Sequence, residues 1–551
     1  MKRLIGIVGI SVFILSCGVG LETPGLFERG PGGKGDGIDV AAWEKGGVVK
    51  YLSGGAHGVL KPTLDGREPI DEANRPYRLH PDLVGDYLKW DASVTEGEAE
   101  WDVFASNWWP QSRNGIAWRW VPGVEQNYEN TTNPKDLSPA EKYDLLVYPG
   151  QTKTINEVTN WPWKEMKKPE AERTGKNVHP KVKVVGPTTT WELQNHGVYQ
   201  STMPDSWWGH CNGWASYATA EKLGAPECDI WVKKVGSEIV KCAEGEEGAV
   251  FFRMGDIEAL MSELYFSDQA TFSGRRCSTE PDEIEFDDDG RPTDQSCRDI
   301  NPGTFHVAVT GLMATGAKPL TGGEEKVRQS FVIDHNYDYE VWNYPLKKFE
   351  IVSQEEITKA EAVQIVSGEQ TGVYKHNENA TRFVKVILNY WMISDGVSAS
   401  QMLLQASERD VSPHEATMSY VLELNGAGEI LGGEWTKAQQ DYWVDSRKAH
   451  PDFLWKAVKV NGWSEGDDDL GGYDDNPNIS YSSVKKLLEL AKQCGGETPQ
   501  PNNICEGQCG QKAQSFACYC DESCTQYQDC CKNDNGEKTN DRSLYVALVC
   551  S

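Results

Sequence analysis

The distribution of cysteines constrains the fold of this chain more than any other feature. Eight of the 15 cysteines fall within the last 47 of the 551 residues: Cys505, Cys509, Cys518, Cys520, Cys524, Cys530, Cys531 and Cys550. So short a segment buries little apolar core, and cross-links replace one. The chain therefore divides into a small disulfide-stapled module and a larger body. Eight cysteines allow 105 pairings, so spacing alone does not fix their connectivity.

The N-terminus has the pattern of an export signal. Lys2 and Arg3 precede an apolar run over 4–15, which is shorter than the roughly 20 residues of a membrane-spanning helix. Ile14-Leu15-Ser16-Cys17 resembles the lipobox of bacterial lipoproteins. The resemblance implies removal of 1–16 and lipidation of Cys17, whereas the alternative is an ordinary cleaved signal. We expect an exported cell-surface or outer-membrane lipoprotein, held to the membrane only by this lipid, or a form released extracellularly.

The charge balance excludes one class of partner. The chain holds 54 Lys and Arg against 83 Asp and Glu, a formal net charge of −29. Nucleic-acid binding draws its affinity from basic side chains, so we expect no nucleic-acid partner. Two acidic stretches have the oxygen ligands that calcium uses, one with Asp287 and Asp289 and one with Asp467 and Asp469. Neither matches the 12-residue calcium loop, and a solvated loop is the alternative. The sequence requires no cofactor, and Ca²⁺ is the one cofactor hypothesis.

Apolar patterning predicts an α+β order for the body. Helices are expected over 215–223 and, with Ser480 as N-cap, over 480–493. A further helix to residue 265 is expected with Asp256 as its cap. Hairpins are expected over 230–242 and 420–431, and strands over 249–253, 305–312, 330–333 and 381–393.

The sharpest site signal is the run Trp207-Trp208-Gly209-His210-Cys211-Asn212-Gly213-Trp214-Ala215. It places a cysteine where a loop enters a helix. The helix N-terminus supplies free N–H groups and partial positive charge, which favour a thiolate. Cys211 is therefore the predicted nucleophile, and a disulfide partner or a buried thiol is the structural alternative.

A thiol nucleophile needs a base, and the base needs an orienting group. His306 opens the apolar run over 305–312, and Asp334 ends the run over 331–334. Cys211, His306 and Asp334 in this order predict a catalytic triad, although a core histidine and a turn-forming aspartate are the ordinary alternatives. His210 and His335 are rivals in these roles, and Asn336 is a further rival of Asp334.

These motifs in order resemble the elicitor-type transglutaminases of oomycetes and their bacterial relatives. Besides the three segments above, the resemblance rests on Ser138-Pro139-Ala140-Glu141-Lys142-Tyr143-Asp144, Glu340-Val341-Trp342-Asn343-Tyr344-Pro345, Gly432-Gly433-Glu434-Trp435 and His450-Pro451-Asp452-Phe453-Leu454-Trp455. It covers roughly residues 100–460. It implies a papain-like or transglutaminase-like catalytic domain, in which the helix bearing the cysteine packs on an antiparallel sheet.

The implied reaction is acyl transfer, joining a peptide glutamine to a lysine amine with loss of ammonia. The implied partners are protein substrates with accessible Gln and Lys. Gln194 is a candidate oxyanion donor because papain-like proteases place a glutamine upstream of the thiol, and Trp208 and Asn212 are its alternatives. Two other readings remain open: a papain-like cysteine protease or glutamine deamidase, and a non-catalytic surface adhesin.

The cysteines outside the C-terminal module suggest local cross-links. Cys277–Cys297 and Cys228–Cys242 would each close a short loop, the second stapling the predicted hairpin, and Cys494 has no obvious partner. The C-terminal pattern, with adjacent Cys530 and Cys531, resembles a somatomedin B domain. That resemblance implies pairs Cys505–Cys520, Cys509–Cys550, Cys518–Cys531 and Cys524–Cys530, as well as a protein partner. The long gap before Cys550 departs from the family.

The expected organisation follows from these segments. It is a signal peptide (1–16), a flexible tether (17–60), a Trp-rich lead-in or pro-segment (61–185), the catalytic domain (186–465), an acidic loop with helix and linker (466–503) and a somatomedin B-like domain (504–551).

Overall fold

The computed structural model describes residues 72–494, apart from 130–132, 267–268, 278, 280–282, 286–291, 315–327, 335–340, 370–375, 410–412, 437–449 and 460–475. The predicted signal, the tether and the somatomedin B-like domain lie outside the described residues. Among those residues, no helix is both long and apolar enough to cross a membrane.

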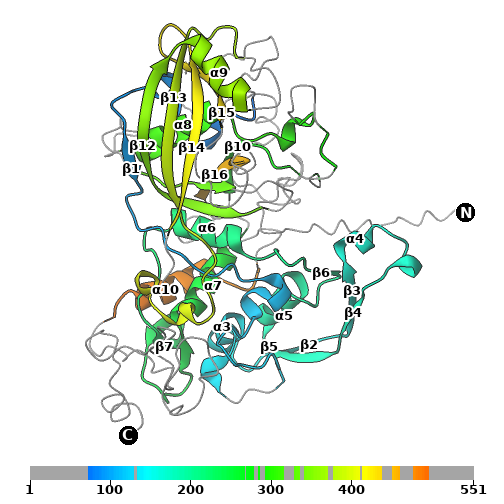
Figure 1. Ribbon diagram of the computed structural model, residues 1–551. Helices are drawn as coiled ribbons and strands as arrows, with labels where there is room; N and C mark the ends of the chain where they lie inside the picture. Colours follow the sequence, from blue (N-terminus) through cyan, green and yellow to red (C-terminus); the bar gives the residue numbers. More distant parts are fainter. Residues whose placement is uncertain are drawn as a thin grey trace, which may run out of the picture.

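An antiparallel sheet of eight strands dominates one half of the molecule (Figure 1). Its strands run in the order β10 (Gln269–Gly274), β16 (Phe453–Lys459), β11 (Val332–Asp334), β12 (Asn343–Ile357), β13 (Arg382–Met392), β14 (His414–Leu424) and β15 (Ile430–Thr436), with β1 (Glu96–Glu98) paired to β12. Residues that alternate along β13 are buried, as expected of a strand with one face on the core.

The other half holds helices and three small sheets. The small sheets pair β2 (Thr152–Ile155) with β5 (Val182–Val185), β3 (Val158–Pro162) with β4 (Asn177–His179) and β6 (Thr202–Met203), and β7 (Ile230–Val235) with β8 (Glu238–Lys241) and β9 (Val250–Phe252). The α-helices of the described residues, in both halves, are α2 (Pro76–Leu79), α3 (Pro139–Val147), α4 (Trp163–Met166), α5 (Pro187–Asn195), α6 (Cys211–Ala220), α7 (Met254–Leu264), α8 (Pro302–Met313), α9 (Lys359–Glu369) and α10 (Tyr481–Ala491).

Helix α6 lies between the two halves (Figure 1). On one side it contacts α7, and on the other it contacts β11, β12 and β16 of the large sheet. The N-terminal residue of α6 is therefore held at the junction of the helical half and the sheet.

Most local predictions are confirmed. The first hairpin forms as β7 and β8, and the second as β14 and β15. Helix α10 begins after Ser480, whose hydroxyl accepts the N–H of Ser483. Asp256 is three positions inside α7, where its carboxylate accepts the N–H of Arg253, so it supports the helix start without being the N-cap.

The segment 305–312 is a helix, and its prediction as a strand is wrong. Helix α8 starts at Pro302 after the cap residue Asn301, whose side chain accepts the N–H of Gly303. Nearly every side chain of α8 is buried, so the helix has no polar face. Without a polar face the apolar run carries no helical period, and only the Asn-Pro start signal distinguishes it from a buried strand.

The disulfide prediction is half right. Cys277–Cys297 is confirmed. Cys228 pairs with Cys494 and not with Cys242, which is a free thiol. The hairpin register sets Cys242 beside Trp231, while the end of α10 runs along the chain at Cys228. This cross-link joins positions 266 residues apart, which sequence spacing does not reveal.

The predicted lead-in shares the main core. Trp120 donates its indole N–H to Asp256 of α7 at 2.7 Å, and the ammonium of Lys142 lies 2.5 Å from the other oxygen of the same carboxylate. Lys142 and Asp256 are both fully buried. Segments on either side of residue 186 therefore pack as one body in the described part of the chain.

Candidate active site

Cys211 is the first residue of α6 and its side chain is buried. The preceding residue, His210, caps the helix through its backbone alone, without a side-chain hydrogen bond. The first N–H groups of a helix have no partner within it, and they give this end a partial positive charge. The position stabilises a thiolate relative to a thiol.

A glycine two residues later explains how α6 reaches this position. A Cβ on Gly213 would lie 1.9 Å from the carbonyl oxygen of Ser262 on α7. The two helices therefore cross too closely for any larger residue. This close crossing holds α6 against α7 and fixes where the helix begins.

Among the described residues, Asn343 has a polar side chain that reaches the thiol. It is the first residue of β12, and its amide nitrogen donates to the Cys211 sulfur at 3.4 Å. Its amide oxygen accepts the indole N–H of Trp455 at 2.9 Å. Both residues are buried. The indole sets which end of the amide faces the sulfur, so the N–H is aimed before any substrate binds.

Asp334 ends β11 directly opposite Asn343 in the strand register. Residues directly opposite on paired strands project from the same face of a sheet. Asp334 is fully buried, and one carboxylate oxygen accepts the N–H of Trp342 at 2.8 Å. The predicted acid therefore lies on the same pair of strands that presents Asn343 to the thiol.

The same groups affect the pKa of the Tyr344 phenol. Burial raises the pKa of Tyr344 well above its ordinary value, and the negative charges of Asp395, Asp334 and Cys211 raise it further. Burial also raises the pKa of Asp395 to about 7. Cys211 and Asp334 are thus within electrostatic range of one buried phenol.

The structure places His306 elsewhere. It lies in the second turn of α8, where its Nδ1 is 2.9 Å from the hydroxyl of Tyr420 on β14. Burial lowers the pKa of His306 to about 4, so the ring is neutral at ordinary pH. Its ring partner is Tyr420, not the Cys211 thiol. The base role of His306 stays a prediction, as does that of His335, which lies outside the described residues together with Asn336.

The three candidate oxyanion donors differ in exposure and in their hydrogen-bond partners. Gln194 is exposed near the end of α5. Asn212 is buried, and its amide nitrogen donates to the carbonyl of Phe266. The backbone N–H of Trp208 donates to Asp205, but its buried indole N–H has no hydrogen-bond partner among the described residues. Among these candidates, the Trp208 indole N–H is therefore the side-chain donor without a partner in the described part of the chain.

The predicted metal ligands Asp287, Asp289, Asp467 and Asp469 lie outside the described residues. Among the described residues, four buried side chains form a group with metal-ligand chemistry: Glu192, His196, His210 and Glu263. Sequence reasoning missed this group. The one local signal was the spacing of Glu192 and His196, which lie four residues apart at the end of α5.

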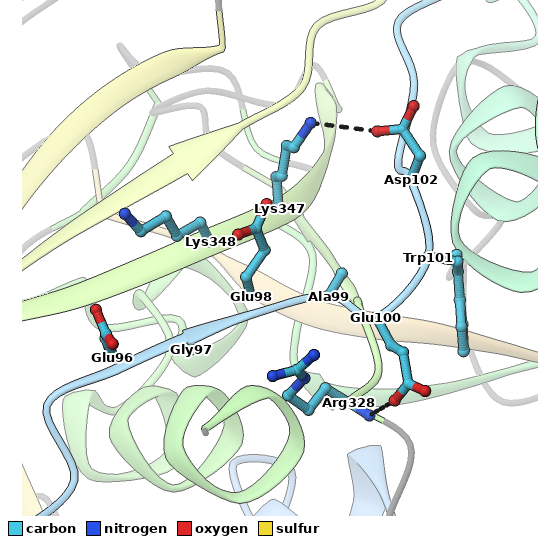
Figure 2. A pocket seen from close by; sticks show the side chains of 10 residues that line it. All are labelled: Glu96, Gly97, Glu98, Ala99, Glu100, Trp101, Asp102, Arg328, Lys347 and Lys348. Atoms are coloured by element: carbon cyan, nitrogen blue, oxygen red, sulfur yellow. Dashed lines mark hydrogen bonds and ion pairs between the residues drawn. The ribbon is translucent and has the colours of Figure 1, made fainter. Parts of the chain in front are cut away.

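An open, highly charged pocket of about 490 Å³ lies along β1 and β12 (Figure 2). Its wall includes ion pairs and hydrogen bonds such as Lys347 with Asp102. Trp101, also in its wall, donates to the carbonyl of Thr219 near the end of α6. At a rise of about 1.5 Å per residue, this end is roughly 12 Å from Cys211 along the helix axis. The pocket adjoins the opposite end of α6 from the thiol.

Comparisons with known proteins bear on the function of this site. The crystal structure of the GP42 transglutaminase from Phytophthora sojae aligns with a TM-score of 0.42 and 21% identity, over 74% of this chain and 96% of that chain. No curated protein matches the chain. Residues 88–494 match the family model of the transglutaminase elicitor, a span that holds Cys211, Asn343 and Asp334. The chain therefore belongs to the transglutaminase elicitor family.

Proposed function

We propose that this chain is a protein-glutamine γ-glutamyltransferase that links glutamine to lysine through a thioester on Cys211. The observation that carries the proposal is the buried thiol at the start of α6, which receives an N–H from Asn343. Membership of the transglutaminase elicitor family supports the reaction class. The two together favour acyl transfer over an inert buried cysteine.

The reaction has two balanced steps. The Cys211 thiolate attacks the glutamine carboxamide, the C–N bond breaks, and ammonia leaves after gaining a proton from the base. A lysine amine then attacks the thioester, gives its proton to the base and releases the thiolate. The backbone N–H of Cys211 and the indole N–H of Trp208 are our candidates for holding the oxyanion in both steps.

Two histidines compete for the role of base. His306 fits the order expected of a papain-like triad, but its ring is buried against Tyr420. His335 follows Asp334 directly in the sequence, and Asp334 is the last residue of the strand that pairs with Asn343. The variants His306→Gln and His335→Gln separate them. Loss of the base costs at least about 100-fold in kcat, whereas loss of a core histidine lowers stability at preserved kcat.

The alternative outcome of the same thioester is hydrolysis. Water in place of the amine gives deamidation of glutamine, and a peptide bond in place of the carboxamide gives proteolysis. The burial of Cys211 supports the amine outcome because a buried thioester is less accessible to water, and Trp208 and Trp214, three residues before and after it in the chain, are buried as well.

The test is incorporation of a labelled primary amine into a glutamine-containing acceptor protein by the purified chain. We expect label incorporation that disappears in Cys211→Ala. Ammonia release without label would establish a deamidase, and cleavage of the acceptor would establish a protease. Absence of any thiol-dependent reaction would leave the adhesin reading and contradict the proposal.

We further propose that the enzyme acts outside the cytoplasm. The lipobox-like Cys17 and the somatomedin B-like spacing after residue 504 support export, lipid anchoring and a protein partner. The disulfides Cys228–Cys494 and Cys277–Cys297 are consistent with an oxidising compartment. Metabolic labelling with a fatty acid, compared between the wild type and Cys17→Ala, tests the anchor.

A further inference from the structure

Four ionisable side chains meet in a fully enclosed site behind the nucleophile. Glu192 and His196 come from the end of α5, His210 from the residue before α6, and Glu263 from α7. All four are buried, and one ligand atom of each lies within 4.8 Å of the others. Unpaired buried charges are costly, so these four ionisable side chains must be stabilised by one another or by a bound ion.

The distances match a tetrahedral metal site. His196 Nδ1 lies 3.3 Å from Glu263 Oε2 and 3.6 Å from Glu192 Oε2, and His210 Nδ1 lies 3.1 Å from Glu263 Oε2. Metal–ligand bonds of about 2.0–2.2 Å in a tetrahedron give ligand separations of about 3.4 Å. These three separations are close to those of ligands around one tetrahedral ion, and all four ligand atoms lie within 4.8 Å of one another.

Backbone N–H groups hold one oxygen of each carboxylate in the group. The N–H of Ile116 donates to Glu192 Oε1 at 2.9 Å, and the N–H of Asn476 donates to Glu263 Oε1 at 2.8 Å. Glu192 Oε2 and both ring nitrogens of His210 form no well-aligned hydrogen bond among the described residues, although His210 Nδ1 lies 3.1 Å from Glu263 Oε2 and His210 Nε2 lies 3.3 Å from Glu192 Oε1. Carboxylates oriented by outer hydrogen bonds, with their free atoms convergent, are the usual arrangement in metal sites.

The walls exclude water and oppose any other occupant. The ring of Phe266 lies 4.5 Å from that of His196 and 4.9 Å from that of His210, measured between centroids. A Cβ on Gly115, whose φ is +52°, would lie 2.1 Å from Glu192 Oε1. The wall therefore leaves no room for an additional methyl group beside Glu192.

We propose that Glu192, His196, His210 and Glu263 bind one divalent transition-metal ion, with Zn²⁺ the best fit. Imidazole nitrogens with carboxylates suit Zn²⁺ and its neighbours, whereas Ca²⁺ takes oxygen ligands. One divalent cation balances the two carboxylates when both imidazoles are neutral. The rival account is a metal-free network in which the histidines carry the positive charge.

An ion at this site is connected to Cys211 through the backbone of His210. The backbone N–H of His210 donates to the carbonyl of Trp108 at 2.6 Å, and the carbonyl of His210 accepts the N–H of Trp214 at 2.9 Å. The next residue is Cys211. An ion bound by the His210 ring therefore fixes the chain at the start of α6, which makes the ion structural and not a participant in the reaction.

The first test is the metal content of the purified full chain after growth with added Zn²⁺. We expect about one Zn²⁺ per chain in the wild type and in Cys211→Ala, and about a tenth of that or less in His196→Gln and Glu263→Gln. The matched control is His179→Gln, a partly exposed histidine on β4, which should keep the full content. Metal retained by both ligand variants would place it elsewhere and overturn the proposal.

A second measurement uses the wild type, so that the test does not depend on whether the variants fold. Removal of metal from the wild type by a chelator should lower the Tm, and Zn²⁺ should restore it. Substitution with Co²⁺ should give the visible bands of a tetrahedral ion without a thiolate charge-transfer band, since no cysteine belongs to the set. A wild-type chain that contains no metal, and whose Tm neither chelator nor Zn²⁺ shifts, would establish the metal-free network.

Discussion

Replacing Asn343 with alanine tests the arrangement around the thiol. The change removes the N–H that lies 3.4 Å from the Cys211 sulfur and strands the indole N–H of Trp455. A hydrogen bond to a charged group contributes about 1.5–3 kcal/mol. At about 1.4 kcal/mol per factor of ten, kcat/KM for amine incorporation should fall roughly 10- to 150-fold. The stranded indole should lower the free energy of unfolding by about 1–3 kcal/mol.

A double variant separates the two effects. Trp455→Phe removes the donor that Asn343→Ala leaves unpaired, so in the Asn343→Ala background it should cost about 1–3 kcal/mol less stability than in the wild type, while kcat/KM stays low. Denaturant unfolding and initial rates on the four proteins of the cycle measure both terms. The reasoning is refuted if Asn343→Ala keeps wild-type kcat/KM, or if the second substitution restores activity together with stability.

Three further predictions follow from burial and connectivity. Trp208→Phe removes a buried indole N–H that has no partner among the described residues, so relief of the unpaired donor should offset about 1–3 kcal/mol of the packing lost with the larger ring, while kcat falls at least about tenfold, measured by unfolding and steady-state rates. His306 has a pKa of about 4 when folded against 6.5 when unfolded, so the unfolded state binds more protons between these values and stability falls on acidification through them. Unfolding at pH 7 and pH 5 should differ by about 2 kcal/mol from this residue, and His306→Gln should lack that part of the slope. Cys228→Ser should lower stability by about 2–5 kcal/mol while Cys242→Ser changes it by less than about 0.5 kcal/mol, because the disulfide joins Cys228 to Cys494; equal losses would contradict this pairing.

The elements that are marked by a local sequence signal were predicted from that signal. The hairpin at Asn425 and Gly426 and the cap at Ser480 are encoded by residues next to one another in the chain. Helix α8 was missed because burial on all sides removes the polar positions that reveal a helical period. The place of Cys211 at a helix start was predicted because the start of a helix is itself a local feature.

Residues brought together from distant segments escaped prediction. Asn343 reaches Cys211 only through the pairing of β11, β12 and β16, which the sequence order does not reveal. The Glu192 and Glu263 carboxylates meet across α5 and α7, 71 residues apart. Only Glu192 and His196 had a spacing that indicated a shared face.

The central claim is that Cys211 carries the acyl group. Mass spectrometry of the intact chain, quenched in acid after incubation with a glutamine peptide in the absence of amine, tests it most directly. The account predicts a mass increase equal to the peptide minus ammonia, located on Cys211 and discharged by added primary amine. An adduct on any other residue, or amine incorporation that persists in Cys211→Ala, would contradict the account.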